Sequence, residues 1–353
     1  MQAKSLKITQ QTLYMHAFIH ANIQQLSKEL TSKNSVLISE KNIYRLYPQI
    51  FENLTTPFLI MTIKEQKKSL STAKKIWDFF ITHAVNKSHT IYIIGGGTLH
   101  DVTTFACSVY MRGLKIISIP TTLLAMTDAA IGGKNAINYR HIKNLIGTIH
   151  LPQKNIIIPE FLQTLPKQEL LSGWAEIIKI ALVTDAAFYQ SIINHLNNSL
   201  IPPPFVIKKS IQLKLKIIRK DLHDQNIRQL LNFGHTIAHA IEGIYDEQKK
   251  HIPHGIAVAQ GMMIESFIAR HIRLLPEKHY QQIFAHLKKH YPLPLLQKKD
   301  IPQLLKKMTY DKKNTTSLIH FTLPEKTGKG KTKIPLDKKT LENILHKFIR
   351  QYL

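Results

Sequence analysis

The sequence predicts two domains: an α/β domain over residues 1–165 and a mostly α-helical domain over residues 166–353. In the first half, short apolar segments alternate with amphipathic ones, which is typical of a parallel sheet covered by helices. After about residue 165, apolar residues recur at helical spacing, and strand signals nearly vanish until residues 318–324. The length of 353 residues suits one large or two ordinary domains.

The elements of the first half follow from short runs of apolar, mostly β-branched residues bounded by turn residues. The predicted strands are residues 35–40, 58–64, 90–98, 115–122 and 155–160. The predicted helices of this half are residues 42–51, 69–85 and 99–111. In the second half, helical periodicity predicts helices over residues 173–183, 204–222, 228–244 and 254–272.

Composition and charge indicate the cellular compartment and the kinds of partner to expect. Cys107 is the single cysteine, so no internal disulfide forms, and a reducing, cytoplasmic compartment is expected. We see no signal peptide and no apolar run long enough to span a membrane. The formal net charge of +25 raises nucleic-acid binding as an alternative. The basic residues are scattered rather than gathered in one stripe, so we expect no nucleic-acid partner and no membrane partner.

Two glycine-containing segments carry candidate binding chemistry. Residues 93–101, IIGGGTLHD, place three glycines between a strand and a helix start, where backbone N–H groups could approach a pyrophosphate. This spacing is not G-x-G-x-x-G, so a structural turn is about equally plausible. Residues 119–144 place Asp128, Lys134, Lys143 and Asn144 around a second glycine pair, which suits an anion site. The alternative is a solvated loop.

Two further segments carry histidines and charges on predicted helices. Glu176 and Lys179 lie three residues apart in an apolar helix, as an internal ion pair or as a metal ligand with a substrate cation. In residues 228–242, the positions of Arg228, Asn232, His235 and His239 fall near one stripe of a predicted helix. Taken alone, the His235–His239 pair is more simply a pair of core or surface histidines. Together, Glu176, His235 and His254 (at the start of the helix predicted from residue 254) would form a two-histidine, one-carboxylate set that suits catalytic zinc.

The combined motifs resemble the 3-dehydroquinate synthase family, within the sugar phosphate cyclases. They occur in the family's order from about residue 35 to residue 324 and are specific together rather than singly. The segments that carry the resemblance are GGGTLHD (95–101), MRG (111–113), PTTLLAMTDAAIGGKNAIN (120–138), KNLIG (143–147), FLQTLPKQELLSGWAEIIK (161–179), R-x-x-LNFGHTIAHAIE (228–242), HG (254–255) and DKK (311–313).

The resemblance implies a Rossmann-like NAD-binding domain, a helical metal-binding domain and a homodimer. It implies conversion of 3-deoxy-D-arabino-heptulosonate 7-phosphate to 3-dehydroquinate and phosphate, a step of the shikimate pathway to chorismate and aromatic amino acids. In that chemistry, NAD is reduced transiently, phosphate is eliminated, hydride returns, the ring opens and an intramolecular aldol reaction closes the carbocycle. The expected cofactors are NAD and Zn²⁺, or Co²⁺ in its place.

The resemblance also assigns roles to residues. The implied metal ligands are Glu176, His235 and His254. The implied catalytic residues are Lys134, Lys179, Lys214, Arg228, Asn232 and His239, so His239 contacts substrate rather than metal. The implied substrate-binding residues are Asp128, Lys143, Asn144, Lys312 and Arg112, the last reaching the neighbouring subunit's site. The implied NAD-binding residues are Glu65, Lys68, Gly95, Gly96, Gly97, Asp101, Thr121, Thr122, Lys134, Lys143, Phe161, Thr164, Leu165 and Glu169.

The chain departs from the family pattern at a few positions, and three alternatives stay open. Leu222 and Ile256 stand where carboxylates are usual, which could loosen the orientation of the metal ligands. One alternative is a sibling cyclase that acts on sedoheptulose 7-phosphate, which lacks the carboxylate. A second is a metal-dependent alcohol dehydrogenase of the glycerol dehydrogenase type, which would accumulate NADH. The third is the basic nucleic-acid-binding protein.

Overall fold

The computed structural model describes residues 16–19, 22–26, 30, 34–140, 142–309 and 318–353. The chain forms two compact units, the first from residues 1–121 and 129–160 and the second from residues 122–128 and 161–353. The short segment 122–128 thus belongs to the second unit although the chain on both sides of it belongs to the first. Each unit is described by itself below.

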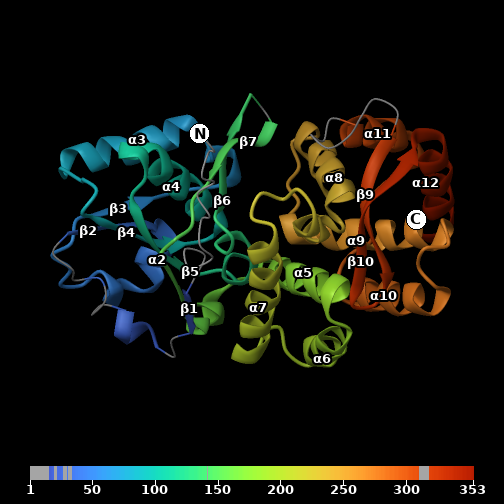
Figure 1. Ribbon diagram of the computed structural model, residues 1–353, viewed down its shortest axis with the longest axis horizontal. Coiled ribbons are helices and arrows are strands. Elements are labelled where there is room, and N and C mark those ends of the chain that lie inside the picture. Colours follow the sequence, from blue (N-terminus) through green and yellow to red (C-terminus); the bar gives the residue numbers. More distant parts are fainter. Residues whose placement is uncertain (1–15, 20–21, 27–29, 31–33, 141, 310–317) are drawn as a thin grey trace, which may run out of the picture. The chain divides into compact units, whose positions relative to one another are not determined.

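The first unit is built on a parallel sheet, as the alternating sequence pattern predicted (Figure 1). The sheet has six strands, and its edge strand at residues 16–19 was not predicted. The strand order is β1-β8-β5-β4-β2-β3. The strands are β1 (His16–Ile19), β2 (Ser35–Glu40), β3 (Phe58–Met61), β4 (Thr90–Gly95), β5 (Lys115–Pro120) and β8 (Lys154–Ile157). The direction of strand succession reverses between β2 and β4, and open α/β sheets bind ligands at the carboxyl ends of the strands at such a point.

Helices of the first unit cover this sheet. They are α2 (Lys41–Leu46), α3 (Leu70–Thr82) and α4 (Gly97–Val109). The helix α4 packs against α3 and against β4 and β5. Ile38, Ile93, Phe80 and Val102 are fully buried in the core between them. This burial fixes β4 and α4, and therefore the glycine turn that joins them.

The first unit also contains an antiparallel hairpin that the sequence analysis did not predict. It is formed by β6 (Lys134–Tyr139) and β7 (Ile142–Ile149). The alternation is visible in β6, where Asn135 and Ile137 are buried while Lys134 and Tyr139 are exposed. The sequence analysis interpreted this region as an anion site, with a solvated loop as the alternative, because lysines and glycines obscure the apolar alternation of a strand of only six residues.

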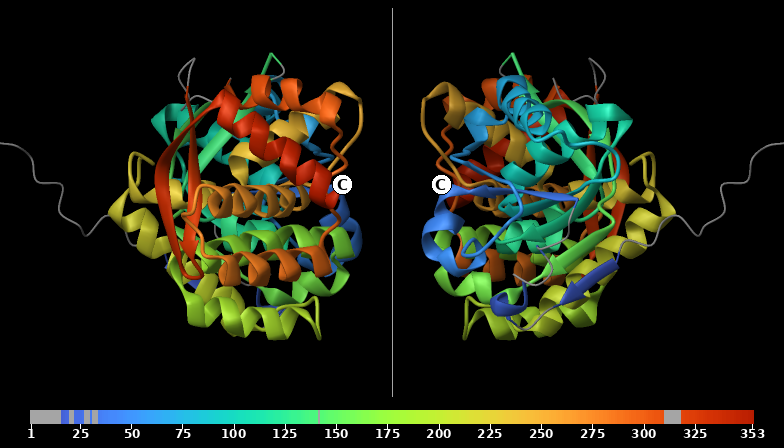
Figure 2. Two further views of the ribbon diagram at one scale, coloured as in Figure 1. Left: turned by 90° about the vertical axis from the view of Figure 1, so that its right-hand side faces the viewer. Right: turned by 90° about the vertical axis from the view of Figure 1, so that its left-hand side faces the viewer.

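The second unit is mostly helical, as predicted, with one antiparallel hairpin. The helices are α5 (Lys167–Thr184), α6 (Ala186–Leu196), α7 (Pro204–Lys220), α8 (His235–Glu247), α9 (His254–His271), α10 (Glu277–His290), α11 (Ile301–Thr309) and α12 (Lys338–Tyr352). The hairpin strands are β9 (Leu318–Lys326) and β10 (Lys329–Asp337). Figure 2 shows α9 in the interior of this unit, and it contacts α5, α8, α10 and α12. Its residues from Gly255 to Ala269 are all buried.

The helix predicted over residues 228–244 is wrong in its first part. Arg228 and Asn232 lie in a short 3-10 helix (Ile227–Asn232), and α8 begins only at His235. Between them, Gly234 has φ of +81°, a left-handed conformation that ends one helix before the next begins. The four positions therefore do not share one helical stripe. Among the described residues, no helix is long and apolar enough to cross a membrane.

Candidate functional site

The second unit brings together three side chains with the geometry of a metal site. Glu176 of α5, His235 at the start of α8 and His254 at the start of α9 each offer a ligand atom, all within 4.8 Å of one another. The Oε1 atom of Glu176 is 3.7 Å from Nε2 of His235 and 3.6 Å from Nε2 of His254. Ligands 2.0–2.2 Å from a tetrahedral zinc ion lie about 3.4 Å apart, so this spacing is close to that of a bound set.

The environment of Glu176 supports a cation at this point. Its side chain is 1% exposed, and within the described chain Oε1 accepts no hydrogen bond. A buried carboxylate oxygen without a donor is costly, because burial removes water without replacing it. A divalent ion at Oε1 would satisfy that oxygen, and two imidazoles with one carboxylate suit zinc with open coordination positions.

Both histidines are held through Nδ1, which leaves Nε2 directed at Glu176. Nδ1 of His235 is 3.2 Å from the carbonyl oxygen of Phe233, and Nδ1 of His254 is 3.3 Å from Oε1 of Glu242. An acceptor at one ring nitrogen fixes the tautomer and orientation of a ligating histidine.

The charges around the three ligands differ in effect. Burial and Lys179 hold the pKa of His235 well below its usual value, so this imidazole is neutral, as a metal ligand must be. Burial alone would raise the pKa of Glu176, but Lys179 and His254 lower it to about 2. Lys179 pairs with Oε2 of Glu176 within α5. The Glu176 carboxylate therefore forms the predicted ion pair through one oxygen and can act as the predicted metal ligand through the other.

A second buried ion pair links α7 to the segment 122–128. Nζ of Lys214 donates to Oδ1 of Asp128 at 2.5 Å and to the backbone oxygen of Asp128 at 2.6 Å. Burial lowers the pKa of Lys214, and the Asp128 carboxylate opposes that effect. The positive charges of Lys179 and Arg228 lower the pKa of Lys214 further. The predicted cations Lys179, Lys214 and Arg228 therefore belong to one electrostatic cluster, which would attract a phosphorylated anion.

Arg228 is positioned by the chain around it. Its guanidinium Nη1 donates to the Leu222 carbonyl at 2.6 Å, and its backbone N–H donates to Asp221 Oδ2 at 3.0 Å. The Asp221 carboxylate also accepts N–H groups from Gln225 and Asn226, which closes the loop before the 3-10 helix. Leu222 thus contributes a backbone oxygen at a position where the resemblance led us to expect a carboxylate.

His239 lies beside the ligands but outside the group of three. Its ring centroid is 5.4 Å from that of His235 and 6.3 Å from that of His254. Asn232 is the last residue of the 3-10 helix, three positions before His235. Both are therefore placed on the same short stretch of chain as the metal ligand His235.

In the first unit, the three glycines form the predicted turn between β4 and α4. Gly95 ends the strand, Gly96 is the N-cap of the helix and Gly97 is its first residue. The Gly96 N–H donates to Oε1 of Glu40 at 2.8 Å, at the carboxyl end of the neighbouring strand β2. The Thr121 N–H donates to the Gly95 carbonyl at 2.9 Å, which ties the end of β5 to the same turn.

A polar cluster in the first unit gathers several predicted nucleotide and substrate residues. Nζ of Lys68 donates to Oδ2 of Asp101 and to Oδ1 of Asn144, each at 2.5 Å. Lys68 is buried, whereas its partner Asp101 is partly exposed. Glu65 accepts from Thr98 at 3.2 Å and from Asn138 at 3.0 Å, beside the same helix start.

The remaining predicted residues are spread over both units. Lys134 begins β6, Lys143 lies in β7, and Arg112 has φ of +64° in a short 3-10 helix after α4. The nucleotide residues that fall in the second unit are Thr122, Phe161, Thr164, Leu165 and Glu169. Burial raises the pKa of Glu169, in the first turn of α5. Lys312 lies outside the described residues.

Sequence reasoning missed two carboxylates near the metal ligands: Glu242 and Glu265. Glu242 lies seven residues after His235, which is a same-face spacing on a helix and could have been noticed. Glu265 is fully buried, and its oxygens accept the backbone N–H groups of Gly234 and Ile237. No local signal marks it, because its partners lie about thirty residues away along the chain.

Comparison with known proteins shows the family of the chain. Family models for the N-terminal and C-terminal parts of 3-dehydroquinate synthase match residues 58–172 and 173–314. A 3-dehydroquinate synthase of Chlamydia abortus is 39% identical over 285 residues, covering 75% of this chain and 74% of the relative. One from Leptospira interrogans is 32% identical, covering 93% of this chain and 94% of the relative.

Solved structures show the same fold at lower identity. A 2-epi-5-epi-valiolone synthase from Streptomyces hygroscopicus, with NAD⁺ and Zn²⁺ bound, has a TM-score of 0.84 at 24% identity over 99% of this chain and 100% of that one. A 2-deoxy-scyllo-inosose synthase complexed with carbaglucose-6-phosphate, NAD⁺ and Co²⁺ has a TM-score of 0.82 at 23% identity over 94% of this chain and 96% of that one. The two matching family models together span more than half of the sequence. The chain belongs to the 3-dehydroquinate synthase family.

Proposed function

We propose that the protein is a carbon–oxygen lyase that converts 3-deoxy-D-arabino-heptulosonate 7-phosphate to 3-dehydroquinate and phosphate. The observation that carries the proposal is the second unit's arrangement of Glu176, His235 and His254 beside buried cations. A metal set alone would equally suit an alcohol dehydrogenase. A cluster of Lys179, Lys214 and Arg228 around it suits a phosphorylated substrate as well.

Two bound groups complete the chemistry. When bound, NAD supplies a reversible hydride acceptor and a Zn²⁺ or Co²⁺ ion supplies a Lewis acid. Family membership and the fit of the three ligands support this cofactor pair.

The roles of the chain's own residues follow from their charge and position. Glu176, His235 and His254 would hold the metal, with Lys179 keeping the second carboxylate oxygen of Glu176 occupied. Lys214 and Arg228 would bind the substrate phosphate as fixed positive charges, oriented by Asp128 and by the Leu222 carbonyl.

Further residues are proposed to contact the substrate and the nucleotide. Lys134, Asn144, Asn232 and His239 occur together in this chain and favour a substrate that carries a carboxylate. The glycine turn and Lys68 are proposed to bind NAD, since backbone N–H groups at a helix start attract pyrophosphate. We further propose a cytoplasmic homodimer in which Arg112 reaches the neighbouring subunit's site, with no nucleic-acid or membrane partner.

The test is phosphate release by the purified protein with NAD and zinc. Each heptulose phosphate is offered separately, and absorbance at the NADH band is followed in the same cuvette. We expect phosphate release from the carboxylated substrate without accumulation of NADH, because the hydride returns in each turnover. A matched His235→Ala variant should keep its circular dichroism spectrum and lose turnover.

Three results would contradict the proposal. Release from sedoheptulose 7-phosphate alone would assign the protein to the sibling cyclases. Lasting NADH would indicate a dehydrogenase. Full activity after removal of metal by a chelator would exclude the metal role of Glu176, His235 and His254.

A further inference from the structure

The start of helix α8 is capped by a buried carboxylate from another helix. Gly234, the N-cap of α8, has no side chain to accept the free N–H groups of the first turn. Glu265 of α9 takes this part: Oε2 accepts the Gly234 N–H at 2.6 Å, and Oε1 accepts the Ile237 N–H at 3.1 Å. Both oxygens of the carboxylate thus accept hydrogen bonds from the turn that carries His235.

The two helices are in close backbone contact at this point. A Cβ atom added to Gly261 would lie 1.9 Å from the carbonyl oxygen of Gly234, so only glycine fits there. On α9, Glu265 lies one turn after Gly261, and His254 lies about two turns before Gly261. One face of α9 therefore supplies a metal ligand, the close contact and the cap.

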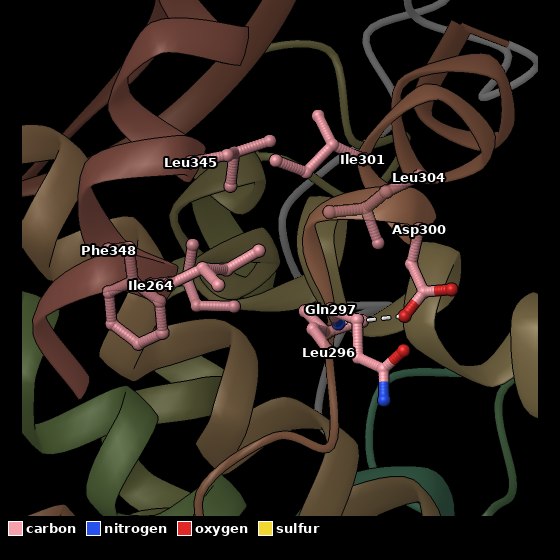
Figure 3. A pocket seen from close by; sticks show the side chains of 9 residues that line it. Ile264, Leu296, Gln297, Asp300, Ile301, Leu304, Leu345 and Phe348 are labelled. Carbon is pink, nitrogen blue, oxygen red and sulfur yellow. Dashed lines mark hydrogen bonds between the residues drawn. The ribbon is translucent and has the colours of Figure 1, made fainter. Parts of the chain in front are cut away.

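Glu265 itself lies in the buried interior of the second unit. It is fully buried, and its neighbour Ile264 faces Leu345 and Phe348 of α12 across a cavity of about 10 Å³ (Figure 3). A cavity of that size barely admits one water molecule, and its lining is mostly apolar.

We propose that Glu265 is a positioning residue for the metal centre: by capping the first turn of α8, it fixes the direction in which His235 presents Nε2. The proposal rests on the metal centre put forward above. Burial raises the pKa of Glu265 to about 8, and the backbone N–H groups of Ile237 and Gly234 oppose this rise, so the cap depends on its two hydrogen bonds rather than on a full charge. Loss of the cap would let the turn fray, and His235, as its first residue, would lose its fixed approach to Glu176.

The test measures metal binding rather than turnover. Zn²⁺ affinity of the metal-free protein is measured by competition with a chelator for the wild type, Glu265→Gln and Glu265→Asp. Glutamine keeps the shape but turns an NH₂ group toward a backbone N–H, and aspartate is one methylene too short. We expect zinc binding about 10- to 100-fold weaker in both, with faster hydrogen exchange of the amides of residues 234–237.

A control separates positioning from general loss of stability. Phe348→Leu, in the core on α12, should lower the unfolding temperature while leaving zinc affinity unchanged. The visible spectrum of bound Co²⁺ gives a further readout, since its bands should shift in Glu265→Gln and not in Phe348→Leu.

Each outcome decides a separate point. Wild-type zinc affinity and an unchanged Co²⁺ spectrum in both Glu265 variants would overturn the positioning role alone. Equal weakening by Phe348→Leu would also overturn it, because destabilisation would then explain the effect. Absence of zinc binding by the wild type would overturn the metal centre itself, and the positioning role with it.

Discussion

Lys179 lies one helical turn after Glu176 on α5, and their charged groups meet with 2% and 1% of the side chains exposed. An ion pair this deeply buried is costly to form and more costly to break, because removing one partner leaves an unpaired buried charge. In the proposed metal-bound state, the cation at Oε1 and the ammonium at Oε2 share one carboxylate. Lys179 is therefore expected to matter most when the metal is absent.

Lys179→Met is predicted to lower the stability of the metal-free protein by about 3–5 kcal/mol. Zinc should restore much of that loss, because the ion supplies the missing positive charge and binds only the folded chain. The measurement is denaturant unfolding with zinc and with a chelator. The control is the double variant Glu176→Gln/Lys179→Met, whose free energy of unfolding should be the same with zinc and with the chelator. Equal stability of metal-free Lys179→Met and metal-free wild type would contradict the prediction.

The pair of Lys214 with Asp128 gives a prediction on catalysis. Asp128→Asn keeps an acceptor for the ammonium but removes the charge that holds it, so we expect kcat/KM to fall about 100-fold. Lys214→Met should cost more, since it removes the proposed phosphate-binding charge itself. Lys209→Met is a matched control, because Lys209 lies on α7 as Lys214 does and forms a partly exposed ion pair with Asp185 at the start of α6. Such pairs contribute about 0–1 kcal/mol, and activity should not change.

Much of the fold was predictable because it is local. The strands β2, β4 and β5 are short runs of apolar residues whose neighbours are turn residues, and each was predicted within three residues of its observed end. The β6–β7 and β9–β10 hairpins were incomplete or missing in the prediction. In β10 only Leu336 is buried, so no apolar alternation marks the strand.

The candidate site was predictable to a different degree. Glu176, His235 and His254 were proposed as a set from their side-chain chemistry on three predicted helices, the resemblance then implied the same ligands, and the structure does bring them together. The helical stripe drawn through Arg228 failed because one glycine, Gly234, breaks the helix. A glycine inside a predicted helix is a local signal for a break, and the prediction gave it too little weight against the helical spacing of the apolar residues.

Gly255 carries a prediction about how α9 meets α5. A Cβ atom at this position would lie 2.1 Å from the carbonyl oxygen of Ser172, and the Gly255 N–H donates to Oγ of Ser172 at 2.9 Å. Gly255→Ala must push the start of α9 away from α5, and His254 with it. We expect a stability loss of about 3 kcal/mol and loss of zinc binding.

Ser172→Ala is the control for that variant, because it removes the hydrogen bond but leaves the space. It should cost about 1 kcal/mol and keep zinc binding. Thermal unfolding and zinc competition measure both effects. Zinc affinity of Gly255→Ala equal to that of the wild type would show that the contact between α5 and α9 does not set the position of His254.

His100, one turn into α4 below the glycine turn, predicts a loss of stability in mild acid. Burial lowers its pKa from 6.5 to about 4, although a hydrogen bond to the Gly96 carbonyl opposes this. Above pH 6.5 the imidazole is neutral in both the folded and the unfolded chain, and its contribution is fully present. As the pH falls below 6.5, the unfolded chain takes up the proton first, so stability decreases until about pH 4. At about 1.4 kcal/mol per pKa unit, the loss is about 3 kcal/mol.

The measurement is the free energy of unfolding as a function of pH. His100→Gln, which can still donate to the Gly96 carbonyl, should flatten the profile between pH 4 and pH 6.5, whereas the exposed His83→Gln variant should leave it unchanged. An identical slope in His100→Gln and the wild type would show that other groups control the acid sensitivity.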